Sequence, residues 1–308
     1  MSTPGKLLVR FWGVRGSYPV PGPSTAHYGG NTPCVEVRAD GQIIILDAGT
    51  GIIPLGKKLL QEDSLNHPAS PLKLILLISH THHDHIQGLP FFLPAHLGKG
   101  ILYIFGPPGM DGAFEDTLSR AMLPPYSPLR LEEMPSTKVI RSLRESQAIL
   151  LRPGESDPVL YNVFHDRVPD NAGAVQIRVM RSYSHPKGGT YVFRIEAGGK
   201  SVVFATDTEG YVGGDARLIA FARGANLLIH DAQYTTAEYL DPDAPKQGYG
   251  HSTVDMAVGV AKEAGVGRLI LFHHDPDHDD DTIRRMEAYA RNHFPATDAA
   301  REGGVYEL

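Results

Sequence analysis

The sequence predicts an α/β protein in which two β-sheets pack face to face and helices cover both outer faces, a four-layer αββα sandwich. Two observations lead to this fold class. Short apolar strands come first, strand–helix alternation follows, and the same order then repeats. The 33 Gly and 24 Pro residues in 308 favour many turns and short strands over long helices. Because no internal repeat or low-complexity linker divides the chain, residues 1–308 are expected to form a single domain.

The first part of the chain is expected to supply a strand, a long loop and a hairpin. Residues 6–12 read as the strand, and the Gly- and Pro-rich residues 13–31 read as the loop. Residues 35–38 and 43–46 form the hairpin around an Asp-Gly turn. Residues 72–79 then give a continuously apolar strand that should be buried on both faces.

The remaining elements follow from the same signals. In the middle of the chain we expect a short helical stretch at 91–96, a strand at 101–105 and an amphipathic helix marked by Phe114, Leu118 and Met122. Residues 124–173, rich in Pro and mixed charge, are expected to form an irregular insertion or flap. Further strands are predicted at 175–182, 190–196, 201–206, 227–229 and 269–272. Helices are predicted around 218–222, after a cap at Ser252 or Thr253, and around 283–290 with Asp281 as its cap.

Composition argues against several function classes. The formal net charge is −6 and no run of five Lys or Arg occurs, so the chain is poorly suited to holding long nucleic acid by its phosphates. Cys34 is the one cysteine, which excludes an intrachain disulfide. The N-terminus lacks the apolar core of a signal peptide, and no stretch reaches the ~18 apolar residues of a membrane span. We therefore expect a cytoplasmic protein without a membrane partner.

A dense set of metal-ligand residues follows the apolar strand. Residues 80–85 read His-Thr-His-His-Asp-His. Imidazole and carboxylate together suit Zn²⁺, Fe and Mn²⁺ better than Ca²⁺ or Mg²⁺. His80 and His82 can point the same way from an extended strand end, while Asp84 and His85 turn toward a second position. The motif therefore predicts two metal positions a few ångströms apart, as two-metal hydrolytic sites require.

Four other predicted strands also end in ligand-type residues. These residues are His185, Asp207, His230 with Asp231, and His273 with His274. Functional side chains gather where strands meet loops, because the sheet supplies rigidity and the loop supplies exposure. The recurrence predicts that distant strand ends share one centre with residues 80–85.

The pattern His-x-His-x-Asp-His after an apolar strand resembles the metallo-β-lactamase superfamily, and residues 79–90 are most similar to its ribonuclease Z branch and related phosphodiesterases. The resemblance implies the metallo-β-lactamase fold and two divalent metal ions. It assigns His80, His82 and His185 to one ion, Asp84, His85 and His273 to the other, and Asp207 as the bridge. Zn²⁺ is the expected metal, and the same ligands admit Mn²⁺ or Fe.

Three further residues are interpreted through this resemblance. The superfamily commonly has a carboxylate at the position of Asp47 that orients metal ligands, and a plain turn carboxylate is the alternative. His83 occupies a variable position and is not expected to be a ligand. His273 is preferred over His274 because it directly follows the strand predicted at 269–272.

Two other segments narrow the reaction class. Residues 250–253 (Gly-His-Ser-Thr) and 230–233 (His-Asp-Ala-Gln) resemble the His-Ser-Thr and His-Glu-Ala-Thr signatures of the ribonuclease Z branch. In that branch a carboxylate orients a histidine that assists phosphodiester cleavage. His251, Asp231 and Asp84 are therefore the predicted catalytic residues, although Asp231 is one methylene shorter than the usual Glu. A protonated histidine beside a carboxylate can protonate the leaving alkoxide after attack by a metal-bridging hydroxide.

The predicted function is a dinuclear metal-dependent phosphodiesterase for a small or cyclic, cyclic-nucleotide-like phosphodiester. The chain has no Gly-rich basic arm of the kind that ribonuclease Z needs to hold tRNA, so long nucleic acid is not the expected partner. Tyr126, Arg15 and Tyr18 are expected to line the substrate pocket. The alternatives are an RNA-processing endonuclease of ribonuclease Z type, a lactonase-like or β-lactamase-like hydrolase, and a metal-bound sensor or scaffold. A homodimer is suggested by analogy alone.

Overall fold

The computed structural model describes residues 6–66, 71–109, 112–125, 127, 129–155, 157–167, 173–211 and 213–308. Two mixed sheets form the centre of this part of the chain. The first sheet has the order β15 (Val305–Glu307), β1 (Leu7–Gly13), β2 (Cys34–Ala39), β3 (Gln42–Leu46), β4 (Leu72–Leu77), β5 (Gly100–Gly106), β6 (Thr137–Ser142). The second has the order β14 (Thr297–Ala299), β13 (Leu269–Phe272), β12 (Leu227–Asp231), β11 (Lys200–Ala205), β10 (Thr190–Ala197), β9 (Val175–Ser182), β7 (Gln147–Leu151), β8 (Val159–Asn162).

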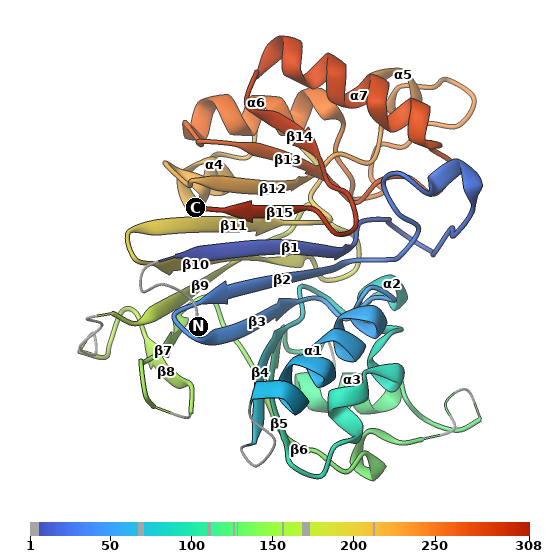
Figure 1. The fold of residues 1–308 in the computed structure, drawn as a ribbon. Helices are drawn as coiled ribbons and strands as arrows, with labels where there is room; N and C mark the ends of the chain where they lie inside the picture. Colours follow the sequence, from blue (N-terminus) through green and yellow to red (C-terminus); the bar gives the residue numbers. More distant parts are fainter. Residues whose placement is uncertain are drawn as a thin grey trace.

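Helices lie on both outer faces of the paired sheets (Figure 1). The α-helices are α1 (Ile52–Asn66), α2 (His83–Ile86), α3 (Phe114–Arg120), α4 (Ala216–Ala222), α5 (Thr236–Tyr239), α6 (Val254–Ala264) and α7 (Asp280–His293). Short 3₁₀ turns occur at Pro23–Thr25, Leu89–Phe91, Leu93–His96 and Leu131–Glu133. Helices α1 and α3 cover the first sheet, and α4, α6 and α7 cover the second. The expected four-layer αββα sandwich is therefore the observed fold.

The main hydrophobic core lies between the two sheets. Phe11 of β1 and Phe272 of β13 come from different sheets, and their ring centroids are 5.9 Å apart. Phe204 of β11 packs against Phe272 from within the second sheet, with 5.5 Å between centroids. All three side chains are fully buried, and removing such a ring from water contributes about 1.5–3 kcal/mol. This layer fixes the two sheets relative to each other, which matters because both carry functional residues.

The strands that carry the functional residues run in parallel. Strand β4 pairs parallel with β3 and β5, and β12 pairs parallel with β11 and β13. The carboxyl ends of parallel neighbours meet at one edge of a sheet, and ligand sites in α/β proteins form there. The loops after β4, β11 and β13 therefore converge, as the sequence predicted.

The structure corrects three expectations about the elements. Residues 124–173 are not simply irregular: they supply β6, β7 and β8, which complete edges of both sheets. Helix α1 was not expected from the sequence. The N-cap of α7 is Asp279, whose Oδ1 accepts a hydrogen bond from the Thr282 N–H at 2.7 Å, rather than Asp281. Among the described residues no helix has both the length and the apolar character needed to cross a membrane.

Candidate metal centre

The motif at residues 80–85 changes direction between its two halves. Strand β4 ends at Leu77 and the chain bends at Ser79. His82 is the N-cap residue of α2 and has extended backbone, with φ −65° and ψ 153°. His83–Ile86 then form a single helical turn. His80 and His82 precede this turn and contribute to one group of ligand atoms, whereas Asp84 and His85 lie in the turn and contribute to another.

The first group of side chains consists of His80, His82 and His185. Each offers one ring nitrogen, and these atoms lie within 4.8 Å of one another. The His82 Nδ1 and His185 Nε2 atoms are 3.0 Å apart. His185 comes from the loop after β9, in the second sheet, and its other nitrogen faces the Gly250 carbonyl at 3.1 Å. The two sheets thus supply this group together.

The second group consists of Asp84, His85, His273 and Asp207. The Asp84 Oδ2 atom lies 3.2 Å from Nε2 of both His85 and His273. The Asp207 Oδ2 atom lies 3.2 Å from Nε2 of His85 and 3.3 Å from Nε2 of His273. Ligand atoms bound to one tetrahedral Zn²⁺ at about 2.0–2.2 Å are about 3.3 Å apart. These four separations match those expected within a single coordination sphere.

Asp207 faces both groups with different oxygens. Its Oδ2 belongs to the second group, while Oδ1 lies 3.7 Å from His80 Nε2 and 3.8 Å from His185 Nε2. Burial alone would raise the pKa of Asp207, but the surrounding histidines, led by His273, hold that pKa well below its usual value. An ionised carboxylate turned to two sites is suited to bridging two cations.

Two buried nitrogens test whether the residues fit a metal. His80 Nε2 and His85 Nε2 are shielded from solvent and form no hydrogen bond. His85 Nε2 forms none although two carboxylate oxygens lie 3.2 Å away. An unpaired buried polar atom costs free energy, and a bound cation would satisfy both nitrogens. The donor set therefore fits a divalent metal.

Asp47 contacts the His85 ring at Nδ1, the nitrogen that does not face the second group. Its Oδ2 lies 2.8 Å from His85 Nδ1 and accepts the Ser79 hydroxyl at 2.8 Å, while Oδ1 accepts the Ser79 N–H at 2.7 Å. A carboxylate on one imidazole nitrogen fixes the tautomer and leaves the other nitrogen free for a metal. The expected orienting role of Asp47 thus has the required contacts, and the alternative of a plain turn residue does not explain them.

Three supporting contacts were not predicted. Gln233 Oε1 lies 3.0 Å from His273 Nδ1 and can orient that ring. The Ser17 N–H donates to Asp84 Oδ2 at 2.8 Å, and Gly16 packs so closely on His273 that an added Cβ would lie 2.4 Å from the ring. Ser17 and Gly16 belong to the loop at 13–31, which the sequence identified only as a loop. The adjacent small residues Gly16 and Ser17 were the sequence feature that could have indicated these contacts.

His251 and Asp231 form the predicted pair. His251 Nδ1 lies 2.7 Å from Asp231 Oδ2, so the shorter Asp reaches the histidine. Asp231 Oδ1 accepts the N–H groups of Gln233 and Ser252 at 3.1 Å and 3.0 Å, which fixes the carboxylate. Burial lowers the pKa of His251, but Asp231 and then Asp207 raise it to about 9. The His251 ring stacks on His273 with 4.9 Å between centroids, which places it beside the metal centre.

Several neighbouring residues lie outside the centre. His83 is exposed and belongs to neither group. His274 Nε2 faces the Ala300 carbonyl at 2.8 Å, and burial lowers the pKa of its ring to about 3, so His273 is the residue in the centre. His230 faces the Asp231 carbonyl at 2.6 Å. Among the described residues, none of these three histidines belongs to a group that could hold a metal.

The expected pocket residues require a correction. Arg15 is fully buried, and its guanidinium donates to the carbonyls of Gly29, Asp275 and His278, so it holds loops together instead of lining a pocket. Tyr18 is half exposed and its hydroxyl lies 3.4 Å from an Asp277 oxygen, outside the cleft described next. Tyr126 lies outside the described residues.

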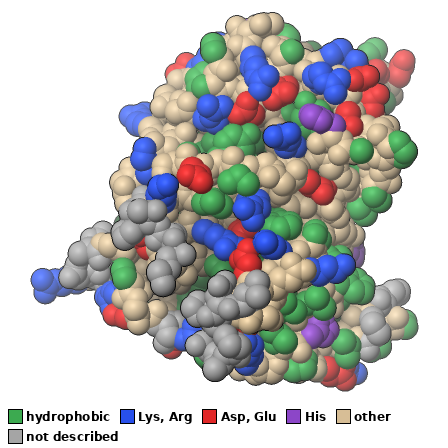
Figure 2. Space-filling view, in the orientation of Figure 1, with side chains coloured by type: hydrophobic (Ala, Val, Ile, Leu, Met, Phe, Trp, Pro, Cys, Tyr) green, Lys and Arg blue, Asp and Glu red, His purple; other side chains and the backbone are tan. Residues whose placement is uncertain are grey.

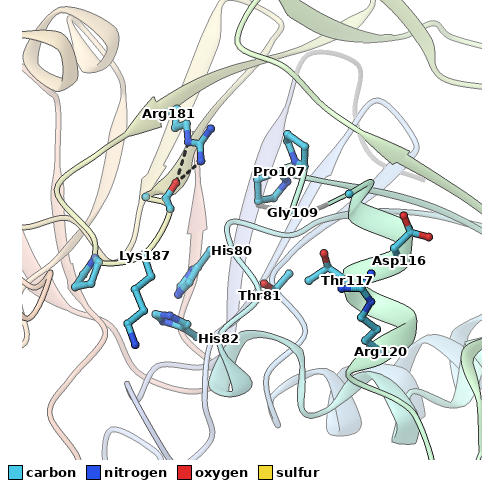
Figure 3. A pocket seen from close by; sticks show the side chains of 15 residues that line it. His80, Thr81, His82, Pro107, Gly109, Asp116, Thr117, Arg120, Arg181 and Lys187 are labelled. Carbon is cyan, nitrogen blue, oxygen red and sulfur yellow. Dashed lines mark hydrogen bonds between the residues drawn. The ribbon is translucent and has the colours of Figure 1, made fainter.

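A cleft of about 260 Å³ opens beside the first group (Figure 3). His80, Thr81 and His82 form part of its lining. One wall comes from the loop after β5 and from α3, and the other from Arg181 and the loop 186–189 before β10. Any molecule in this cleft would lie directly against the candidate metal ligands.

A match to a known protein family shows which family the chain belongs to. The family described as beta-lactamase superfamily domain matches residues 42–274, which include all seven proposed ligands. The chain belongs to the beta-lactamase superfamily. The ligand motif, the two-group centre and the αββα layers are all features of its metallo-β-lactamase fold, so the sequence-based family prediction is confirmed.

Several known proteins resemble the chain over most of its length. Ribonuclease BN of Escherichia coli O1:K1 is 26% identical over 274 residues, covering 80% of this chain and 86% of the relative. The metallo-β-lactamase fold protein YhfI from Bacillus subtilis superposes with a TM-score of 0.65 at 20% identity, covering 98% and 100%. A diphosphatase from the PhnP family superposes with a TM-score of 0.63 at 16% identity, covering 98% of each chain.

Membership of the superfamily settles the general chemistry. Proteins of the metallo-β-lactamase fold bind divalent metals, and the chain is a hydrolase of this fold. The two groups around Asp207 are the place where its described residues could hold such metals. The substrate that the chain accepts depends on the surroundings of this centre.

Proposed function

We propose that this superfamily member hydrolyses small or cyclic phosphodiesters with the help of two divalent metal ions. The observation that carries the proposal is the pair His251 and Asp231 beside the bridging carboxylate. The His251 Nδ1 is 2.7 Å from Asp231 Oδ2 and 3.9 Å from Asp207 Oδ1. A hydrolase for lactams or lactones has no need for a second histidine at this place, whereas a phosphodiesterase has a use for it.

The chemical reason is the leaving group. Cleavage of a phosphodiester expels an alkoxide, which is a strong base and must be protonated. Asp231 favours the protonated imidazole and orients it, so His251 can hold a proton beside the centre. Two cations held by the seven ligands would supply a hydroxide near neutral pH and neutralise the phosphate oxygens. Of these ligands, Asp84 is fixed by the Ser17 N–H, and Asp207 faces both groups.

Zinc is the proposed metal. Five imidazole and two carboxylate ligands form the two groups, and this mixture suits Zn²⁺ first, with Mn²⁺ and Fe as alternatives. Metal analysis of protein purified without added metal would test both the identity and the stoichiometry. Two equivalents per chain are expected, and one equivalent or none after reconstitution would contradict the dinuclear proposal.

A small substrate is proposed for two reasons. The cleft beside His80 and His82 has a volume of about 260 Å³, close to the lower end of ligand pockets, ~300 Å³. On the face shown in Figure 2, Lys and Arg side chains alternate with acidic and hydrophobic ones and form no continuous basic stripe. A protein that binds long nucleic acid depends on such a stripe.

The direct test is a substrate panel assayed with Zn²⁺- or Mn²⁺-loaded protein. Bis-p-nitrophenyl phosphate and cyclic AMP represent a diester with a good leaving group and one with an alkoxide leaving group. We expect turnover of both, and β-lactam and lactone substrates serve as the matched acyl controls. Hydrolysis of the acyl substrates alone would overturn the proposal.

A second candidate is an RNA-processing endonuclease. The similarity to Ribonuclease BN, at 26% identity over 274 residues, favours it. Cleavage of a tRNA precursor with a rate that falls steeply as salt is raised would identify this function, because such binding depends on phosphate contacts. Under the leading proposal, precursor cleavage is slow compared with the small diesters.

A further inference from the structure

We propose that Lys187 binds a second phosphate group of the substrate, one that is not cleaved, and that Arg120 on the opposite wall attracts this group without contacting it. The preferred substrate would then be a small phosphodiester that also carries a phosphate monoester. This inference rests on the proposed phosphodiesterase function and specifies the substrate class for the same site. Its basis is the pair of walls that enclose the cleft beside His80 and His82.

The two basic residues come from opposite walls of that cleft. Arg120 lies in the last turn of α3, and Lys187 lies in the loop between β9 and β10. Figure 3 shows His80, Thr81 and His82 between the two walls. A substrate whose scissile phosphate is at the two histidines would extend between Lys187 and Arg120.

Neither cation is used by the fold. Within the described part of the chain, neither Lys187 nor Arg120 forms an ion pair within 4.0 Å or a side-chain hydrogen bond. Both are exposed, so their charges are solvated and available. The third cation of the cleft, Arg181, differs because its guanidinium donates to the Gly188 carbonyl and stacks over Tyr183 at 5.4 Å. Arg181 therefore shapes the loop that presents Lys187.

One carboxylate, Asp116, also lines the cleft. It is committed to the start of α3, where its Oδ2 accepts the Ala113 N–H at 3.1 Å. Asp116 and Arg120 are four residues apart on the helix, but no ion pair within 4.0 Å joins them. The charge balance of the lining therefore favours an anion, with Lys187 free to contact it.

The backbone at Lys187 supplies an independent argument. Its φ is +57°, in the left-handed region that L-residues rarely adopt, and it precedes Gly188 and Gly189, which also have positive φ. Glycine or asparagine would take this conformation with less strain. A lysine kept there at a cost to the fold indicates that its side chain has a use, because strained backbones cluster at functional sites.

The test compares two chromogenic substrates that differ by one phosphate. Thymidine 5′-(p-nitrophenyl phosphate) has only the scissile diester, and its 3′-phosphorylated form carries the additional phosphate. We expect the unmodified protein to have a lower KM for the 3′-phosphorylated form. In Lys187→Asn that KM should rise about 5- to 20-fold, the effect of losing one charge-assisted hydrogen bond at a partly exposed site. In Arg120→Gln it should rise less, because Arg120 acts only through its charge.

Lys200→Asn is the matched control. Lys200 is an exposed lysine at the turn between β10 and β11, at the far end of β10 from Lys187. It should leave both KM values unchanged. Lys187→Asn should also unfold no earlier than the unmodified protein, because asparagine suits the left-handed backbone, so a loss of binding cannot be assigned to unfolding.

The outcomes separate the inference from the function on which it rests. Equal KM values for both substrates in the unmodified protein would overturn the second-phosphate site. A fall in kcat on both substrates in Lys187→Asn would also overturn it, because Lys187 would then act at the scissile phosphate.

A binding measurement tests the phosphate site even if neither chromogenic substrate is hydrolysed. Calorimetric titration with thymidine 3′,5′-bisphosphate and thymidine 5′-phosphate should show tighter binding of the bisphosphate, and Lys187→Asn should remove the difference. If neither chromogenic substrate is hydrolysed while this difference is present, the phosphodiesterase proposal fails and the phosphate site stands. If the difference is absent, the phosphate site fails.

Discussion

Strained residues gather at the candidate centre. Among the described residues, six non-glycine residues have positive φ, and five of them lie at the centre or its cleft: Ser17, Asp47, Lys187, Asp207 and His273. Asp47, Asp207 and His273 each follow closely after the end of β3, β11 or β13. A left-handed residue costs about 1–2 kcal/mol, and here it turns the side chain out of the strand direction into the centre. The fold thus accepts local strain to position the ligands.

His251→Ala tests the proposed proton donor. Loss of the imidazole should lower kcat on cyclic AMP by about 100-fold or more, because an alkoxide needs a proton. The effect on bis-p-nitrophenyl phosphate should be much smaller, since p-nitrophenolate leaves readily without one. Metal content should stay unchanged, which matters because His251 also lies within 4.8 Å of His185 and Asp207 at the ligand atoms.

The control for this experiment is His83→Ala, an exposed histidine of the same motif that belongs to neither group. It should retain both activities and both metals. An equal loss on both substrates in His251→Ala, or a loss of metal, would show that His251 acts as a ligand and that the proton-donor role is wrong.

Among the strands and helices, the sequence predicts those whose own residues form a recognisable pattern. The ends of β4, β11 and β13 could be located because apolar runs stop at polar ligand residues, and all seven proposed ligands do converge. Helix α1 was missed because Pro54 and Gly56 weaken its helical pattern. Strands β14 and β15 have only three residues each, which is too short for a periodic signal. Contacts such as Ser17 to Asp84 join distant segments, and no local pattern reveals them.

Gly16→Ala tests the contact between the N-terminal loop and the centre. The added Cβ would lie 2.4 Å from the His273 ring, so either the ring or the loop must move. We expect weaker metal binding in the second group and a loss of about 1–3 kcal/mol of stability from overpacking. Metal titration and thermal unfolding measure the two effects.

Gly22→Ala is the matched control in the same loop. An added Cβ at Gly22 meets no atom within 4 Å, and its φ of −175° is extended backbone that alanine adopts freely. This variant should bind two metals with unchanged affinity. If Gly16→Ala behaves in the same way as Gly22→Ala, the loop does not position His273.

At the scale of the whole molecule, the centre connects the two sheets. His80, His82, Asp84 and His85 follow β4 of the first sheet, whereas the remaining three ligands follow β9, β11 and β13 of the second. Any cation held by both sets therefore links the layers at one edge, in addition to the hydrophobic core between them. Metal binding should accordingly stabilise the entire sandwich and not only a local loop.

Removal of metal provides the test of this link. A ligand that binds only the folded state stabilises it by RT ln(1 + [L]/Kd), about 4 kcal/mol at a thousand times Kd. For a chain of this size we expect chelation to lower the unfolding midpoint by roughly 5–15 °C. Adding Zn²⁺ back to the chelated protein should restore the midpoint.

Asp207→Asn separates this link from nonspecific effects of the chelator. The substitution removes the charge that faces both groups, since Oδ1 lies near His80 and Oδ2 near His85. The variant should therefore unfold near the midpoint of the chelated protein whether or not a chelator is present, because it no longer holds either cation well. If chelation lowers the midpoint of Asp207→Asn as much as that of the unmodified protein, the metals that stabilise the fold are bound elsewhere. The proposed bridge between the sheets would then be wrong.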